Sequence, residues 1–169
     1  YDQMSPLTKE QILSYFEGNF PNNYSLSSAP SDLLTFEIPT QQLYKIVSHL
    51  FHDDELGFQF LTDICGVHYP DNTGEELVVV YHLHSMKHGT RIRLKVKAPI
   101  SKPDIPTLTG LYGSANWMER ETYDFYGVNF VGHPNLKRIL NMDEMVEFPM
   151  RKEFPLEDPT RVDKADFQF

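Results

Sequence analysis

The stretch from Glu76 to His84, ELVVVYHLH, constrains the fold of this chain more than any other. Its apolar side chains occupy consecutive positions, so both faces of an extended strand would be apolar there. A strand with that composition is buried on two sides, in the interior of a sheet. The chain has 169 residues, which is long enough for one domain with a real core and a small extension.

A second strand, RIRLKVK, is predicted after a turn at KHG, and it alternates strictly between apolar and basic residues. The inward set is Ile92, Leu94 and Val96, and the outward set is Arg91, Arg93, Lys95 and Lys97. The outward set has two interpretations. It is either the solvated side of an edge strand, where lysines block unwanted pairing, or a docking face for an acidic partner.

Two helices are expected before these strands. Residues 5–18 begin with Ser5 or Thr8 as a cap, place Pro6 in the first turn and end at Gly18. The second helix has the clearer pattern, because its apolar residues follow the i, i+3, i+4, i+7, i+8 spacing. These residues are Leu43, Ile46, Val47, Leu50 and Phe51.

Two more strands are expected at residues 33–38 and 58–65. The second is predicted to hold alternate residues on one face, with a bulge or an end at Gly66. The residues of that face are Phe58, Phe60, Thr62 and Ile64. Helices before and among meandering strands predict an α+β class, a two-layer domain with helices packed on a mixed, mainly antiparallel sheet.

Beyond Lys97 the pattern changes. KPDIPTLTGLYGS is a proline- and glycine-rich linker, and a third helix is expected from Ser114 or Asn116 to Gly127. Asn116 and Glu119 have the spacing of a capping pair. The predicted core therefore covers residues 1–127.

Residues 128–169 show no sustained helical or strand period, yet aromatic residues are spread through them. They are Phe130, Phe148, Phe154, Phe167 and Phe169. A disordered tail is usually poor in aromatic residues. We therefore expect an extended C-terminal tail that buries its aromatic side chains in the groove of another subunit.

The bulk composition excludes several classes of function. A net charge of −9 argues against a general nucleic-acid binder. The single cysteine, Cys65, leaves no internal disulfide and fits a reducing compartment. The first residues lack a signal-peptide pattern, and no apolar run approaches the roughly 20 residues that cross a bilayer. Membrane contact is therefore expected only through a partner.

The candidates for chemistry are few. His82 and His84 share one face of a strand, and with His68 they suggest a soluble metal-dependent hydrolase as a second hypothesis. Cys65 reads as a packed core residue rather than a nucleophile. Neither GxxxxGK[ST] nor GxGxxG occurs, so flavin, nucleotide and iron–sulfur binding have no support in the sequence.

The densest cluster of charge is ERETYDFYG, from Glu119 to Gly127. Arg120 and Asp124 have i, i+4 spacing and can pair on the surface, which would contribute only about 0.3–0.5 kcal/mol. Glu119 shares a face with Tyr123 and Tyr126, a mixture of charge and aromatic area that favours an interface over an active site.

The same residues carry a resemblance to a known family. Glu119-Arg120-Glu121 with Asp124-Phe125-Tyr126, His133, Lys137, Ile139 and Leu140 resembles the signature of the NADH dehydrogenase 30-kilodalton subunit of bacterial respiratory complex I. FLTDICGVHYP, YGSANWMERETYDFYGV and FPMRKEFPLEDP resemble further parts of the family, and the likeness covers residues 33–160. His68 and LNMDEMVEF (residues 140–148) depart from it.

The resemblance implies a structural and assembly subunit of the peripheral arm, with no cofactor, no metal and no catalytic residue of its own. It implies partners in the hydrogenase-like large subunit of the quinone site and in iron–sulfur subunits, which with FMN and quinone would carry the chemistry. It also implies a peripheral location on the cytoplasmic side of the inner membrane, or the matrix side in mitochondria. A related module of a hydrogenase-type complex is the other family-level alternative.

The residues expected at the subunit interface belong to two groups. The first anchors the helix, and the second fixes the tail. They are Glu119, Arg120, Glu121, Asp124 and Tyr126, and then His133, Lys137, Arg138, Arg151 and Lys152.

Overall fold

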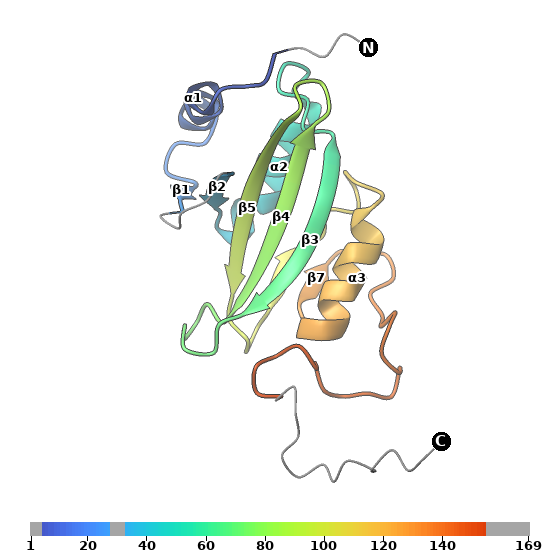
Figure 1. Ribbon diagram of the computed structural model, residues 1–169. Helices are drawn as coiled ribbons and strands as arrows, with labels where there is room; N and C mark the ends of the chain where they lie inside the picture. The colour runs from blue at the N-terminus through green and yellow to red at the C-terminus, as the bar shows by residue number, and fades with distance from the viewer. Residues whose placement is uncertain (1–4, 28–32, 155–169) are drawn as a thin grey trace, which may run out of the picture.

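The computed structural model describes residues 5–27 and 33–154, which build a two-layer α+β domain (Figure 1). Its larger sheet has the strand order β1-β2-β5-β4-β3. The strands are β1 (Ser25–Leu26), β2 (Leu34–Glu37), β3 (Phe60–His68), β4 (Leu77–Ser85) and β5 (Thr90–Ala98). All neighbours are antiparallel except β2 and β5, which are parallel. The predicted fold class is confirmed.

Strand β4 is the interior strand that its sequence predicts, since Val78 and Val80 are buried on the face away from the helices. Strand β5 lies between β2 and β4, so the edge-strand interpretation of its basic residues is wrong. The alternation itself is confirmed, because Ile92, Leu94 and Val96 are buried. The basic side contacts its own chain: Lys97 Nζ lies 3.1 Å from Glu37 and 2.9 Å from Glu75.

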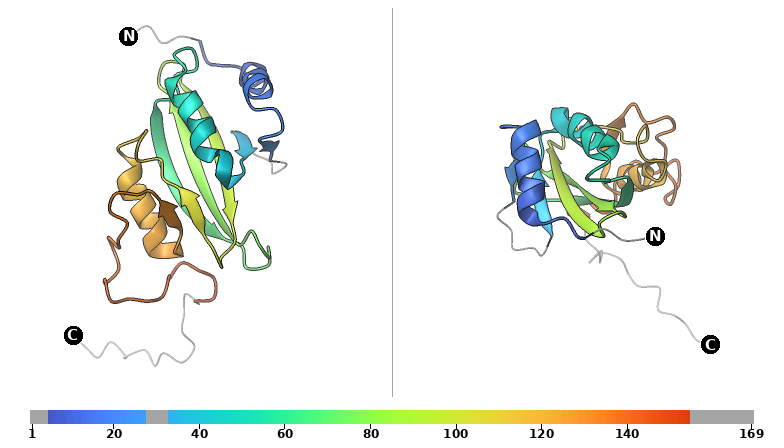
Figure 2. Two further views of the ribbon diagram at one scale, coloured as in Figure 1. Left: turned by 180° about the vertical axis from the view of Figure 1, so that it is seen from behind. Right: turned by 90° about the horizontal axis from the view of Figure 1, so that it is seen from above.

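Helices α1 (Lys9–Asn19) and α2 (Leu43–His52), with the short 3-10 helix η1 (Thr40–Gln42), cover one face of the sheet (Figure 2). Thr8 caps α1 through a reciprocal capping box with Gln11. The helix continues through Gly18 to Asn19, one residue beyond the expected stop. Phe16 anchors α1 by stacking on Phe36 of β2, with ring centroids 3.9 Å apart.

Strand β3 corrects the predicted face. Its register shifts between Leu61 and Asp63, which is a β-bulge at Thr62. The bulge turns Leu61 and Ile64 into the core and leaves Phe60 49% exposed. The strand then runs straight through Gly66. A Cβ at that position would overlap the ring of Tyr126, so glycine there admits the last turn of helix α3 against the strand.

Helix α3 (Ala115–Tyr126) connects two short parallel strands, β6 (Asp104–Pro106) and β7 (Asn129–Val131). It lies alongside β3, the last strand of the sheet (Figures 1 and 2). The helix ends at Gly127 as expected, because this residue adopts the left-handed conformation with φ 75°. The predicted capping pair is wrong, since Ser114 is the N-cap and Glu119 points into the interior.

The boundary predicted at residue 127 does not coincide with an edge of the folded unit. Val128 and Phe130 are buried in the same core as the sheet. The backbone of residues 139–147 then binds to the side chains of Asp124 in α3 and of Arg138 in the loop. The burial of the tail's aromatic side chains in another subunit stays a prediction. Phe167, Phe169 and the rest of residues 155–169 lie outside the described residues.

Candidate interaction site on helix α3

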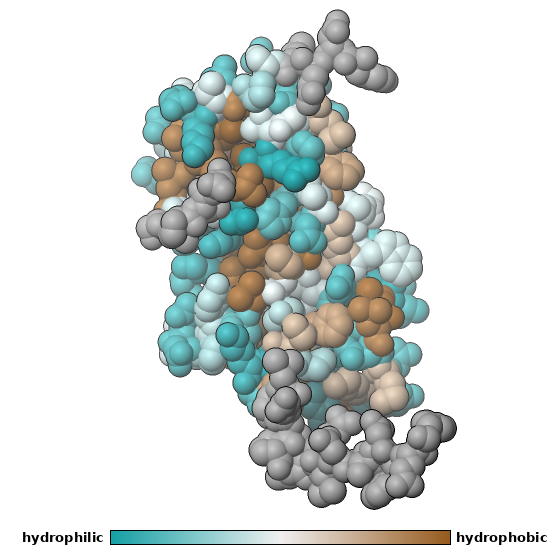
Figure 3. Space-filling model, in the orientation of Figure 1, coloured by the Kyte–Doolittle hydropathy of each residue, from teal (hydrophilic) through white to brown (hydrophobic). Residues whose placement is uncertain are grey.

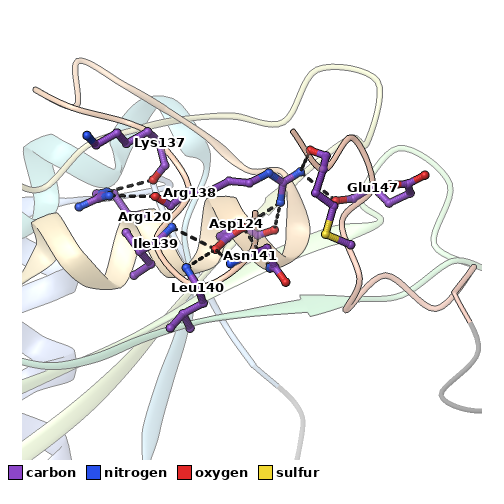
Figure 4. A network of polar contacts seen from close by, with 9 residues as sticks. Arg120, Asp124, Lys137, Arg138, Ile139, Leu140, Asn141 and Glu147 are labelled. Carbon is purple, nitrogen blue, oxygen red and sulfur yellow. Dashed lines mark hydrogen bonds and ion pairs between the residues drawn. The ribbon is translucent and has the colours of Figure 1, made fainter. Parts of the chain in front are cut away.

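Asp124 is the centre of a buried polar network between α3 and the loop that follows β7 (Figure 4). Its Oδ2 accepts hydrogen bonds from the backbone amides of Ile139, Leu140 and Asn141 at 3.1, 2.8 and 3.0 Å. Its Oδ1 accepts from Arg138 at 2.8 Å and from the Asn141 side chain at 3.0 Å. Burial alone would raise the pKa of Asp124, but these donors together hold it well below its usual range.

Arg138 extends the network further along the loop. Its Nη1 donates to the carboxylate and to the backbone carbonyl of Asp124, each at 2.8 Å. Its Nη2 donates to the carbonyls of Met145 and Glu147 at 2.7 and 2.9 Å. The ring of Phe148 lies 5.1 Å from the guanidinium carbon. One buried cation therefore fixes three points of the chain.

Arg120 completes the arrangement from the other side. Its Nε and Nη2 donate to the carbonyls of Lys137 and Arg138, both at 2.9 Å, and Trp117 covers the guanidinium at 5.0 Å. Arg120 and Asp124 therefore do not form the surface pair that their spacing allows. Each of the two binds the loop, and both are buried. We call Arg120, Asp124 and Arg138, with the backbone that they bind in residues 137–147, the α3 clasp.

Glu119 performs a similar task one turn earlier. Its carboxylate accepts from the amide of Leu108 at 2.7 Å and from the hydroxyl of Thr107 at 2.5 Å. Burial raises the pKa of Glu119 to about 7, although these two hydrogen bonds act in the opposite direction.

His133 approaches Glu119 without forming an ion pair. The ring nitrogen Nε2 lies 4.0 Å from the Glu119 carboxylate. Because the amide of Asn135 donates to Nδ1, that nitrogen carries no proton in this arrangement. Nε2 therefore bears the hydrogen and donates it to the carbonyl of Asn116 at 3.0 Å.

The end of the described chain returns to α3 as well. Arg151 donates through Nε to the carbonyl of Tyr126 at 2.8 Å, a favourable place for a cation at a helix C-terminus. Phe148 and Arg151 crowd Gly127 so closely that a Cβ there would lie 2.6 Å from each. The amide of Lys152 donates to Nδ1 of His68 at 2.9 Å, which gives His68 a structural role.

The residues predicted for the interface thus separate by exposure. Four have buried side chains that contact their own chain: Glu119, Arg120, Asp124 and Arg138. The His133 ring is also enclosed, and Tyr126 and Arg151 are half-buried. Glu121, Lys137 and Lys152 are exposed. The four buried residues hold neighbouring segments of their own chain in place. Only the three exposed residues offer fully exposed side chains to a partner.

Sequence reasoning missed the most exposed apolar residues of this region. Leu140, Met142, Val146 and Met150 project from the loop that the clasp holds, and Trp117 projects from α3 beside it. The available signal was a run of apolar residues alternating with acids in a segment without any period. An apolar residue at such a position has no place in the domain's own core.

The predicted metal ligands do not converge. His68 is in register with Leu77, and His82 is five residues further along β4, which separates the two by roughly 16 Å. His82 instead accepts a hydrogen bond from Arg93, and burial and then Arg93 lower its pKa. In residues 5–27 and 33–154 no group of three or more possible ligands could hold a metal ion. The hydrolase hypothesis fails on this geometry.

Cys65 is half-buried in β3, and burial is the main cause that raises the pKa of its thiol. A raised pKa keeps the thiol protonated, which is opposite to what a nucleophile needs. Within the described part of the chain, no helix combines the length and the apolar character that crossing a membrane requires.

The fold and the α3 clasp define the class of protein. It is an α+β module in which buried charged side chains bind the module's own loop. The chain belongs to the respiratory-chain NADH dehydrogenase, 30 Kd subunit family, whose profile matches residues 36–160. The family resemblance predicted from the sequence is thereby confirmed.

Relatives that are named as subunits of NADH-quinone oxidoreductase come from Nocardioides sp. and Streptomyces coelicolor, and each is 46% identical over 123 residues. The alignment covers 73% of this chain and 49% of each relative, so the chain spans about half the length of the curated relatives it matches.

Two solved structures share the fold. One is a trypsin-resistant fragment (1-134) of Nqo5, with 34% identity and a TM-score of 0.64 over 75% of this chain and 98% of the fragment. The other belongs to an archaeal membrane-bound sulfane sulfur reductase, with 26% identity and a TM-score of 0.73 over 87% of this chain and 85% of that one.

Proposed function

We propose that this chain is a cofactor-free structural and assembly subunit in the peripheral arm of a complex I-type quinone oxidoreductase. Electron transfer to quinone and the coupled ion translocation would belong to the whole complex. Membership of the family and the likeness to NADH-quinone oxidoreductase subunits support the proposal. The isolated chain would catalyse no reaction.

The observation that carries the proposal is the saturation of the α3 clasp. A catalytic acid, base or anion-binding cation needs a free lone pair or proton directed at a substrate. Here the carboxylate of Asp124 accepts five hydrogen bonds, and Arg138 and Arg120 donate to the backbone. The most distinctive residues of the sequence therefore fix the path of a loop.

The partners follow from the family. We expect the chain to contact the hydrogenase-like large subunit of the quinone site and the iron–sulfur subunits, which would carry the clusters, FMN and quinone. Glu121, Lys137 and Lys152 remain candidates for direct contacts, because their side chains are exposed. The chain would reach the membrane only through the complex, on the cytoplasmic side of the inner membrane or the mitochondrial matrix side, and would bind no nucleic acid.

A second candidate keeps the module and changes the complex. The archaeal sulfane sulfur reductase contains a chain of similar shape, as the TM-score of 0.73 shows. The same module thus occurs in a respiratory membrane complex with another reaction. The 46% identity to quinone oxidoreductase subunits, against 26% to that chain, favours the first candidate.

Replacement of Arg120 by alanine in cells that carry no other copy of the chain tests the proposal. We expect Arg120→Ala to lower the amount of assembled complex, because two loop carbonyls lose their donor, while quinone reduction per assembled complex stays unchanged. Native gel electrophoresis and activity per complex measure the two quantities. Lys45→Ala, the removal of an exposed cation from α2, is the matched control. Normal assembly with lost quinone reduction would instead indicate an active-site role.

A further inference from the structure

We propose that residues 140–150 form a preorganised docking strip for an apolar surface that carries lysine or arginine on another subunit of the same complex. This inference rests on the proposed function and specifies the chemistry of one partner contact. The docking strip consists of Leu140, Met142, Val146 and Met150 with the acids Asp143, Glu144 and Glu147.

The first argument is exposure. In the part of the chain that the structure describes, the three most exposed large apolar side chains are Val146, Met142 and Leu140, at 81, 73 and 65%. They lie within seven consecutive residues, and Figure 3 shows apolar side chains gathered over α3 and the loop after it. Single apolar residues on a surface are normal, but a cluster of them marks an interaction site.

The second argument is rigidity. Asp124 binds three successive amides at the start of the strip, and Arg138 binds the carbonyls of Met145 and Glu147 in its middle. The amide of Met150 donates to the carbonyl of Phe125 at 3.2 Å at its end. Since the backbone is already fixed, binding would cost little conformational entropy.

The third argument is charge. Residues 139–150 contain three acids and no lysine or arginine. The carboxylates of Asp143, Glu144 and Glu147 are exposed and form no ion pair with described residues. A partner of complementary charge would therefore present basic residues around an apolar centre. The two methionines suit such a contact, because their side chains adapt to irregular surfaces.

A depression beside the strip offers a place for one partner side chain. It has a volume of about 480 Å³, and its walls carry three cations and one carboxylate beside Trp117: Arg120, Lys137, Arg138 and Asp143. It suits an apolar side chain of the partner, while the partner's basic residues would face the carboxylates of the strip. Trp117 is 64% exposed, and tryptophan is one of the residue types that are enriched where binding energy concentrates.

The same charges disfavour the other possible occupants. A second copy of this chain would bring three carboxylates against three carboxylates, and like charges across an interface are costly. A membrane surface of anionic lipids would be repelled in the same way. A basic, apolar protein surface is the occupant that fits.

The test uses the full chain in the cells that make its complex. A photo-cross-linking amino acid at position 142 or 146 should yield an adduct to another oxidoreductase subunit, at a peptide that contains lysine or arginine. The control position is 86, because Met86 is comparably exposed in the turn between β4 and β5. We expect no adduct from there.

Two sets of substitutions measure the effect. Met142→Ser with Val146→Ser, and separately Asp143→Lys with Glu144→Lys and Glu147→Lys, should each lower assembled complex about tenfold. Met86→Ser should change nothing. All of these side chains are exposed, so the thermal unfolding of the purified chain should remain as in the wild type.

The outcomes separate the two proposals. If the wild-type chain assembles but both sets of variants assemble equally well, or if the adduct joins two copies of this chain or a lipid, the docking strip is overturned and the proposed function stands. If the wild-type chain co-purifies with no oxidoreductase subunit, both proposals fail.

Discussion

The two sides of this domain are held together by opposite means. Helices α1 and α2 cover the sheet through apolar contacts, with Phe16, Phe36 and Leu50 all fully buried. The loop beside α3 is held by Arg120, Asp124 and Arg138, three charged residues that make hydrogen bonds instead. Apolar burial is proportional to area and tolerates variation, whereas a buried charge needs its specific partners.

This difference teaches what each side can tolerate. Removal of a methylene group from the covered face weakens a contact that its neighbours partly restore. Removal of Arg138 or of Asp124 leaves the other charge without its ion-pair partner in the interior, which is more costly than the pair was worth. We therefore expect the α3 side to fail locally and the sheet side to fail globally.

The largest effect should come from Arg138→Ala. It removes the only charged donor among the five that bind the buried Asp124 carboxylate, and it leaves the carbonyls of residues 145 and 147 without Arg138, at a cost of about 3–5 kcal/mol. Hydrogen exchange should show the amides of residues 139–147 losing protection while those of β4 keep theirs. Lys137→Ala is the control, since that side chain is exposed. Equal loss of amide protection in residues 139–147 and in β4 would contradict the expected difference between the two sides.

A core substitution should show the opposite pattern. Leu83 is fully buried in β4, and Leu83→Ala should lower the free energy of unfolding by about 3 kcal/mol. Because α3 and its loop rest on the sheet, urea unfolding followed by fluorescence and by hydrogen exchange should report one transition at a lower midpoint. A variant whose clasp amides stayed at wild-type protection would show that the α3 side is independent.

Acid–base titration sharpens the comparison on the α3 side. The pKa of Glu119 is about 7 in the folded chain against an ordinary 4.5, so the folded state holds a proton that the unfolded chain releases. The free energy of unfolding should therefore fall as pH rises between these values, by up to about 1.4 kcal/mol per pH unit. Glu119→Gln should remove this slope in denaturation measured from pH 5 to 7.

The contribution of Asp124 to the free energy of unfolding depends on pH in the opposite direction. The pKa of its carboxyl is lowered in the folded state, so its contribution is present above the ordinary value of 3.8 and is lost as pH falls further. Denaturation of the Glu119→Gln variant from pH 5 down to 3 should still lose stability. A flat curve over that range would contradict the assigned role of Asp124.

The smallest effect concerns the entry to α1 on the sheet side. Thr8→Ala removes the hydroxyl of the capping box and should cost about 1 kcal/mol. Thermal unfolding by circular dichroism would measure it, with Ser14→Ala, at an exposed position within the same helix, as the control. A loss as large as that of Arg138→Ala would mean that α1 matters more to the fold than its apolar contacts suggest.

The sheet side was largely predictable from the sequence, because its elements follow local rules. The apolar spacing from Leu43 to Leu50 matches the buried face of α2, and the unbroken apolar run of β4 matches its interior position. The bulge at Thr62 escaped prediction, since no glycine or proline marks it. It is set by how β3 fits its neighbour.

On the α3 side, the sequence predicts which residues matter but not what their side chains contact. The sequence indicates that the charged residues of the helix matter, and it predicts the helix end at Gly127. Their partners are not predictable, because each hydrogen bond between α3 and the loop joins residues 14–18 positions apart through a segment without periodicity. Local spacing allows Arg120 to pair with Asp124, whereas in the structure each of them binds the loop after β7.

The guanidinium of Arg138 grips main-chain oxygens of residues 145 and 147, not their side chains. The backbone path of residues 145–147 therefore does not depend on which side chains these residues carry. Substitutions at the exposed positions of this stretch would change the affinity for a neighbouring subunit, in evolution or in engineering, while the backbone conformation of the loop stays the same.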